Sequence, residues 1–180
     1  MPLPKKNEHT IKEIYALPEG ARAELIDGEI YDMAPPNRIH QELVQQLSRI
    51  IGNYIVDHNG ECRVYPAPFA VFLNKDDRTY VEPDISVTCA GDKLDENGCN
   101  GAPDWIIEIV SPGSQRMDYL TKLFKYRTAG VREYWIVNPM KQTVLVYSFG
   151  EKEDSTQYLF EDEIQVGIYP EFTIKISNYL

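Results

Sequence analysis

The spacing of hydrophobic residues predicts one long amphipathic helix over residues 38–56. Apolar side chains recur there at intervals of three and four positions, which places them on one face of an α-helix. They are Leu43, Val44, Leu47, Ile50, Ile51, Tyr54 and Ile55.

Shorter runs rich in β-branched and aromatic residues predict strands. Asp27-Gly28 supplies the positive φ angles of a tight turn, which makes residues 23–31 a hairpin. Residues 104–110 are too few for a helix and suit a buried strand. The other predicted strands are 62–73, 81–88, and the hairpin 133–138 with 143–149, followed by weaker strands within 151–180.

A second helix is predicted from Ser114, as its cap, to about Ala129, with Gly130 just beyond its end. Residues 90–103 are polar and Gly-rich, which is typical of a surface loop. This order of elements favours an α/β (α+β) protein with a mixed sheet and helices packed on it. At 180 residues, we expect a single domain over 1–180.

The net charge of −10 and the pI near 4.8 argue against broad electrostatic capture of nucleic acid, although a local basic face stays compatible with them. The polar segment 1–10 resembles no secretory signal, and no apolar run has the length of a membrane helix. The three cysteines match no zinc or redox spacing. We therefore expect a cytoplasmic protein with reduced thiols and no membrane partner.

Glu108 stands out because it interrupts the apolar run Trp105-Ile106-Ile107-Glu108-Ile109-Val110. Both faces of such a strand are apolar, so the strand should be covered on both sides. A buried carboxylate costs several kcal/mol unless a compensating group is present. The partner is either an arginine or lysine in a plain ion pair, or a bound cation.

Asp84 follows Pro83 in another predicted strand, where alternation puts it on one face with Glu82 and Ser86, opposite the core. Alone it is an ordinary solvated strand residue. Two carboxylates on neighbouring strands, however, repel each other unless a cation lies between them. Asp84 and Glu108 are therefore candidate ligands of a divalent metal.

Lys122 is the candidate third member. On its helix Leu120, Leu123 and Phe124 form the apolar stripe, and Asp118 and Lys122 lie on the adjacent flank. Their i, i+4 spacing fits either a surface ion pair or a lysine folded back over the end of the Glu108 strand.

Two further residues are weaker candidates. His40 lies on or near the buried flank of the long helix, where it is either structural or able to reach a phosphate or water. Glu24 alternates with Leu25 in the first hairpin and is either exposed or an additional inward carboxylate.

An Asp, Glu and Lys set has a clear chemical use. Mg²⁺ accepts one or two carboxylates together with water and substrate phosphates. In such a site it activates water for attack on a phosphodiester, and the lysine orients that water or offsets charge on phosphorus.

The ordered set from Glu24 to Tyr147 resembles the PD-(D/E)XK nuclease superfamily, and within it the Uma-type family of endonucleases. The resemblance rests on Pro83-Asp84, Glu108-Ile109-Val110, the helix with Asp118 and Lys122, and the segments around Glu24, His40 and Gly130. It implies a restriction-endonuclease-like fold, DNA as the substrate and Mg²⁺ or Mn²⁺ as the cofactor. It also makes a homodimer plausible, in which two chains could form a local basic cleft.

By the same resemblance, Asp84 and Glu108 bind the metal, Lys122 is the catalytic lysine, and Glu24, His40 and Asp118 are accessory. One departure is that Val110 stands where the superfamily has its lysine, two positions after Glu108. In the Uma-type family the lysine lies on the helix, and Lys122 fits that place. Two alternatives stay open: a catalytically degenerate module that binds nucleic acid or a protein, and a hydrolase of a small phosphorylated substrate.

Overall fold

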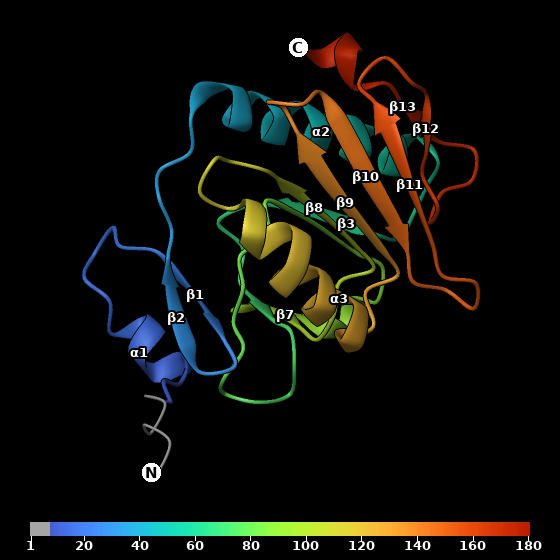
Figure 1. Ribbon diagram of the computed structural model, residues 1–180. Helices are drawn as coiled ribbons and strands as arrows, with labels where there is room; N and C mark the ends of the chain where they lie inside the picture. Colours follow the sequence, from blue (N-terminus) through green and yellow to red (C-terminus); the bar gives the residue numbers. More distant parts are fainter. Residues whose placement is uncertain (1–7) are drawn as a thin grey trace.

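The computed structural model describes residues 8–180 and shows a central mixed sheet with helices on both faces (Figure 1). In spatial order its six strands are β11 (Asp154–Leu159), β10 (Thr143–Ser148), β9 (Glu133–Asn138), β8 (Trp105–Ile109), β5 (Ile85–Thr88) and β3 (Arg63–Pro66). The strands β8 and β9 run parallel, and the other neighbours run antiparallel. The predicted mixed sheet flanked by helices is confirmed.

Smaller elements surround this sheet. They are α1 (Ile11–Tyr15), the hairpin β1 (Ala23–Ile26) and β2 (Glu29–Asp32), α2 (Arg38–Asp57), the three-stranded sheet of β4 (Val71–Phe72), β7 (Gly98–Asn100) and β6 (Leu94–Asp95), the π-helical segment η2 (Met117–Lys122), α3 (Leu123–Ala129), the pair β12 (Ile164–Gln165) and β13 (Thr173–Ile174), and the 3₁₀ turns η1 (Gly91–Lys93) and η3 (Ile176–Tyr179).

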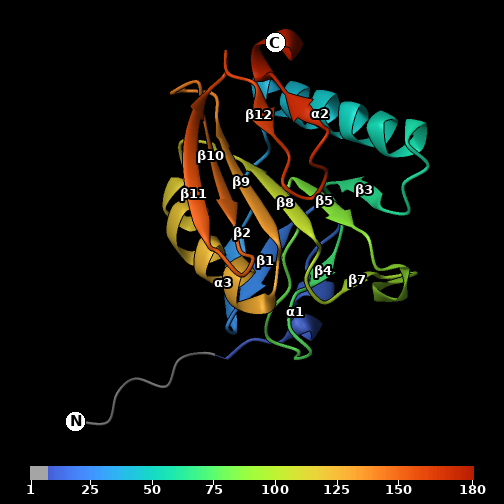
Figure 2. The ribbon, with the colours of Figure 1, turned by 90° about the vertical axis from the view of Figure 1, so that its right-hand side faces the viewer.

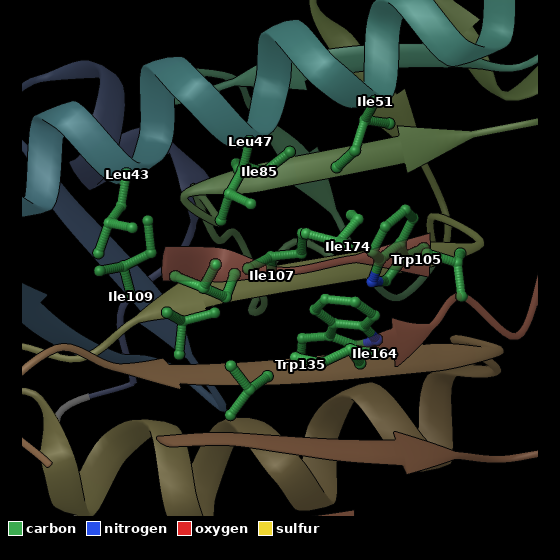
Figure 3. Close-up of a cluster of buried hydrophobic side chains, with 14 of the residues drawn as sticks. Leu43, Leu47, Ile51, Ile85, Trp105, Ile107, Ile109, Trp135, Ile164 and Ile174 are labelled. Atoms are coloured by element: carbon green, nitrogen blue, oxygen red, sulfur yellow. The ribbon is translucent and has the colours of Figure 1, made fainter. Parts of the chain in front are cut away.

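The helix α2 covers one face of the sheet, with α3 on the other (Figure 2). The predicted apolar face of α2 forms one buried cluster with Ile85, Trp105, Ile107 and Trp135 of the sheet (Figure 3). Complete burial of such side chains contributes about 1.5–3 kcal/mol each to the stability of the folded state. The helix predicted over 38–56 is confirmed.

The intervening residues of these strands point to the opposite face of the sheet, toward α3. Ile106, Val110, Tyr134 and Ile136 form a second buried cluster there with Tyr126 of α3. Because β8 has apolar neighbours on both faces, all its residues are buried, as the pattern around Glu108 predicted. The sheet thus carries Glu108 into the α3 side of the core.

Several local predictions are confirmed by the structure. Asp27 and Gly28 take φ angles of 52° and 79° in the β1–β2 turn, and β9 pairs with β10 in the second predicted hairpin. Gly130 ends α3 in a left-handed conformation with φ of 97°.

Other boundaries differ from the predictions. The run 62–73 is split into two strands, β3 and β4. The predicted loop 90–103 contains β6 and β7, where Cys99 is fully buried. Ser86 and Glu82 are also buried, because the face opposite α2 is covered as well. The expectation that this face of the Asp84 strand is open was therefore wrong.

The expectation of three reduced thiols was also wrong. Cys62 and Cys89 form a disulfide, since the register of β3 against β5 brings the ends of these strands side by side. Cys99 is a free, buried thiol.

Residues 1–7 of the polar segment 1–10 lie outside the described part of the chain. Within residues 8–180, no helix has both the length and the apolar character needed to cross a bilayer.

Candidate active site

Glu108, near the end of β8, is the centre of a buried polar cluster. Its Oε1 accepts hydrogen bonds from Lys122 Nζ at 2.8 Å and from the hydroxyl of Tyr126 at 2.6 Å. Its Oε2 accepts from the main-chain N–H of Asp84 at 3.3 Å. The carboxylate thus lies between the lysine on one side and the Asp84 backbone on the other.

Asp84 immediately precedes β5, beside Glu108 in the neighbouring strand. Its Oδ2 accepts from the N–H of Ile109 at 2.7 Å and contacts His40 Nε2 at 3.1 Å. Within residues 8–180, no hydrogen bond uses Asp84 Oδ1. Because both side chains stand on the face opposite α2, Asp84 and Glu108 are adjacent, as predicted.

The helix that carries Lys122 turns its polar flank toward the core, whereas the sequence predicted that the apolar stripe would be buried. Leu120 and Phe124 are 62% and 61% exposed, whereas Asp118 and Lys122 are 2% and 5% exposed. These two polar residues lie in η2, a π-helical segment of the kind often found at functional sites. The surface-pair alternative for Lys122 was therefore wrong, and the lysine reaches the end of the Glu108 strand.

Glu24 of β1 was predicted to be either exposed or directed inward, and the structure shows that it is directed inward. It is 4% exposed, and its Oε1 lies 2.9 Å from Lys122 Nζ and accepts from the N–H of Glu82 at 3.0 Å. Behind it, the carboxylate of Glu82 binds Arg22 and the hydroxyl of Tyr80. Lys122 is consequently held between two carboxylates supplied by strands 84 residues apart in the sequence, Glu24 and Glu108.

The other two accessory candidates also lie here. His40, in the first turn of α2, has a side chain only 12% exposed and contacts Asp84. Asp118 accepts a 2.5 Å hydrogen bond from the hydroxyl of Ser114, the residue predicted to cap this helix. All six predicted residues are thus brought into one cluster.

The cluster holds more negative than positive charge, and its pKa values reflect this. Burial raises the pKa of Glu108 well above its usual value despite the opposing charge of Lys122. Burial likewise raises the pKa of Asp118 to about 6. Burial acts to lower the pKa of Lys122, but Glu108, Glu24 and Asp118 outweigh it and leave that pKa well above normal. Lys122 is therefore cationic at neutral pH.

The pKa of His40 has a similar balance. Burial lowers it, but the hydrogen bond and the charge of Asp84 outweigh that effect and raise the pKa above its usual value. His40 thereby adds positive charge beside Asp84 more readily than a free histidine does.

The donors suit a hard divalent cation that keeps most of its water. Within residues 8–180, no group of three or more His, Cys, Asp or Glu side chains is placed to enclose a metal. Within residues 8–180, Asp84 Oδ1 accepts no hydrogen bond and Glu108 Oε2 accepts only the long one from Asp84 N–H, so both retain lone pairs for a cation. Mg²⁺ needs only one or two carboxylates when water and phosphate complete its shell, so this pair fits it.

Tyr126 is the site residue that the sequence prediction missed. It is fully buried, and burial together with Glu108 raises the pKa of its phenol well above normal, so it remains a hydrogen-bond donor. It lies four residues after Lys122, which itself lies four residues after Asp118, so the three share one flank of the helix. That spacing was the available signal, but an aromatic residue on a helix more often indicates core packing.

We expect Tyr126→Phe to weaken Mg²⁺ or Mn²⁺ binding about tenfold, because the carboxylate of Glu108 is less firmly oriented when its Oε1 accepts only from Lys122. Titration calorimetry with each metal measures the change. The matched control is Tyr134→Phe: the Tyr134 ring packs edge-on to Tyr126 at 5.0 Å, but its hydroxyl donates to the main-chain oxygen of Asp118. Equal losses in both variants would refute a specific role for Tyr126.

Comparison with known proteins finds similar sequences and a similar fold. A chain from Anabaena variabilis, solved as "a putative nuclease belonging to DUF820", superposes with a TM-score of 0.74 at 25% identity. That match covers 94% of this chain and 96% of the other.

A curated relative is the "Uncharacterized protein slr1290" of Synechocystis sp., 25% identical over 125 residues. The match takes in 69% of this chain and 60% of the relative, so the chain spans less than two thirds of that protein's length. The model of the Uma2 family, described as "Putative restriction endonuclease", matches residues 11–177. The chain therefore belongs to the Uma2 family of restriction-endonuclease-like proteins.

Proposed function

We propose that this protein is a metal-dependent endonuclease that hydrolyses phosphodiester bonds of DNA. The observation that carries the proposal is the placement of Glu108, with one oxygen on Lys122 and the other toward Asp84. The description of the Uma2 family and the name of the Anabaena protein support a nuclease.

The proposed cofactor is Mg²⁺ or Mn²⁺, held by Asp84 and Glu108. When bound, such an ion polarises the scissile phosphate and lowers the pKa of the attacking water. The hydrogen bond from Ile109 N–H and the contact with His40 fix the Asp84 carboxylate before any ligand arrives. A carboxylate that is already oriented loses little freedom on binding.

Lys122 acts in this proposal as a fixed positive charge and hydrogen-bond donor. Because its pKa is raised well above normal, it is unsuited to take a proton from water. Glu24 and Glu108 hold its ammonium group at 2.9 and 2.8 Å. From there it would orient the attacking water or offset charge developing on the phosphate.

The acidic chain needs a local positive surface to admit DNA. Arg116 is exposed two residues before Asp118, and Arg38, which forms an ion pair with Glu42, is exposed two residues before His40. We propose that such residues, with a second copy of the chain in a homodimer, form that surface. A cytoplasmic location belongs to the same proposal, and reducing conditions there would open the Cys62–Cys89 bond.

The net charge of −10 favours one other candidate, a hydrolase of a small phosphorylated substrate. Such a substrate needs no extended basic surface, and the same carboxylates and lysine would serve it. A catalytically inactive module that binds nucleic acid or a protein is the remaining alternative.

The test is incubation of the pure protein with supercoiled plasmid and with oligonucleotides in Mg²⁺, Mn²⁺ or chelator. We expect cleavage only when a metal is present. Metal binding without cleavage of any nucleic acid would contradict the proposal. In that case, hydrolysis of small phosphodiesters to monoesters, or of monoesters to phosphate, would establish the other hydrolase.

A further inference from the structure

Two aromatic rings stack at the edge of the sheet beside the site. The ring centroids of Tyr65 and Phe69 lie 4.2 Å apart, and the ring planes differ by 7°. Phe69 packs against the buried cluster on the α3 side, whereas Tyr65 belongs to none of the buried clusters of the described residues. Tyr65 is half-buried, and its hydroxyl makes no hydrogen bond within residues 8–180. Tyr65 is thus the outer ring of the pair, and Phe69 covers one of its two faces.

The register places this ring next to Asp84. Tyr65 of β3 pairs with Ser86, and the N–H of Ala67 donates to the main-chain oxygen of Asp84 at 2.9 Å. Alternation therefore puts Tyr65 on the same face as Asp84 and Glu108. Diagonal neighbours across an antiparallel pair lie about 7–8 Å apart, a separation that one nucleotide spans.

The strand β3 ends the sheet on this side (Figure 2). Arg63 lies two residues before Tyr65, so it shares the face of Tyr65, and it is exposed. An aromatic ring and a cation on the same face of an edge strand combine the two groups by which proteins bind single-stranded nucleic acid.

We propose that Tyr65 stacks a base of single-stranded DNA whose neighbouring phosphate lies at Asp84 and Glu108. This inference rests on the proposed nuclease function and names its substrate class. A base inside a duplex is already stacked and cannot cover the ring. Stacking also supplies affinity that an acidic chain cannot obtain from broad phosphate contacts.

The experiment measures binding separately from cleavage. A short fluorescent single strand, its duplex and an abasic strand of equal length are titrated with protein by anisotropy, in Ca²⁺ and in chelator. We expect Tyr65→Ala to weaken binding of the single strand roughly 5- to 150-fold. Tyr65→Trp should retain it, and neither variant should alter binding of the abasic strand. Tyr15→Ala, which removes another exposed aromatic ring, is the matched control.

The outcomes separate the two proposals. Unchanged single-strand binding by Tyr65→Ala, duplex bound as tightly as single strand, or no binding of any strand would each overturn the stacking site. If DNA is cleaved with metal but Tyr65 is irrelevant, the nuclease proposal stands and the stacking site fails. If single-strand binding depends on Tyr65 but no metal supports cleavage, the stacking site stands and the nuclease proposal fails.

Discussion

Replacing Asp84 by asparagine is expected to reduce metal-dependent DNA cleavage roughly a hundredfold or more. The asparagine carbonyl can still accept the hydrogen bond from Ile109 N–H, so the side chain keeps its place. It loses the charge, however, and a hard divalent cation binds a neutral amide more weakly than a carboxylate.

The same variant should not be less stable when metal is absent. Asp84 is one of the negative charges that raise the pKa of Glu108 and Asp118. Its removal relieves repulsion in a buried cluster, which offsets the weaker contact with His40. Loss of activity together with unchanged or higher stability is the pattern expected of a residue kept for function.

Plasmid cleavage in Mg²⁺ and urea unfolding in chelator measure the two effects. Asp92→Asn in η1, at an exposed aspartate outside this cluster, is the control and should match the wild type. Cleavage by Asp84→Asn at the wild-type rate would rule out Asp84 as a metal ligand.

Some of the site follows from local sequence. A carboxylate within a short apolar run has no exposed face to occupy, so Glu108 could be identified as buried without any knowledge of its partners. The pairing of Asp84 with it followed from two adjacent strand patterns. Both inferences needed only the two-residue repeat of a strand.

The orientation of the Lys122 helix could not be obtained in this way. Periodicity shows which residues share a face, but choosing the inner face assumes that the core is apolar. Here the helix meets a cluster of carboxylates, so Lys122 and Asp118 point inward and Phe124 outward. The resemblance to the Uma-type family supplied the correct side for Lys122, and the hydrophobic pattern did not.

Contacts between distant segments were also beyond local patterns. Glu24 accepts from the N–H of Glu82 and from Lys122 because the first hairpin packs against the segment before β5. The hairpin pairs with that segment through an isolated β-bridge between Leu25 and Tyr80, for which no pattern in the sequence gives a signal. The inward side of a short hairpin is decided by what it packs on.

Replacing Lys122 by methionine is expected to destabilise the metal-free protein by about 3–5 kcal/mol. Methionine keeps the length of the side chain but leaves Glu24 and Glu108 facing each other without a cation. Cleavage should also be lost. Lys141→Met, which alters an exposed lysine, should change neither property.

The pH dependence of this loss has a definite sign. The charge of Lys122 opposes the burial that raises the pKa of Glu108, so its removal raises that pKa further. A carboxyl group with a higher pKa in the folded state than in the unfolded state binds more protons when folded. The free energy of unfolding of Lys122→Met should therefore fall as the pH rises above the normal carboxyl range, and the variant should be closest to wild type in acid.

A second substitution separates the structural role of Lys122 from its catalytic role. In Glu24→Gln/Lys122→Met, one negative and one positive charge are removed together, and the glutamine carbonyl can still accept from the N–H of Glu82. We expect urea unfolding to show recovery of much of the lost stability, with a coupling energy of about 1–3 kcal/mol between the two positions. Cleavage should stay absent, because restored charge balance does not restore an ammonium group beside the phosphate. If the double variant regained cleavage along with stability, Lys122 would be only a structural counter-ion of Glu24 and Glu108.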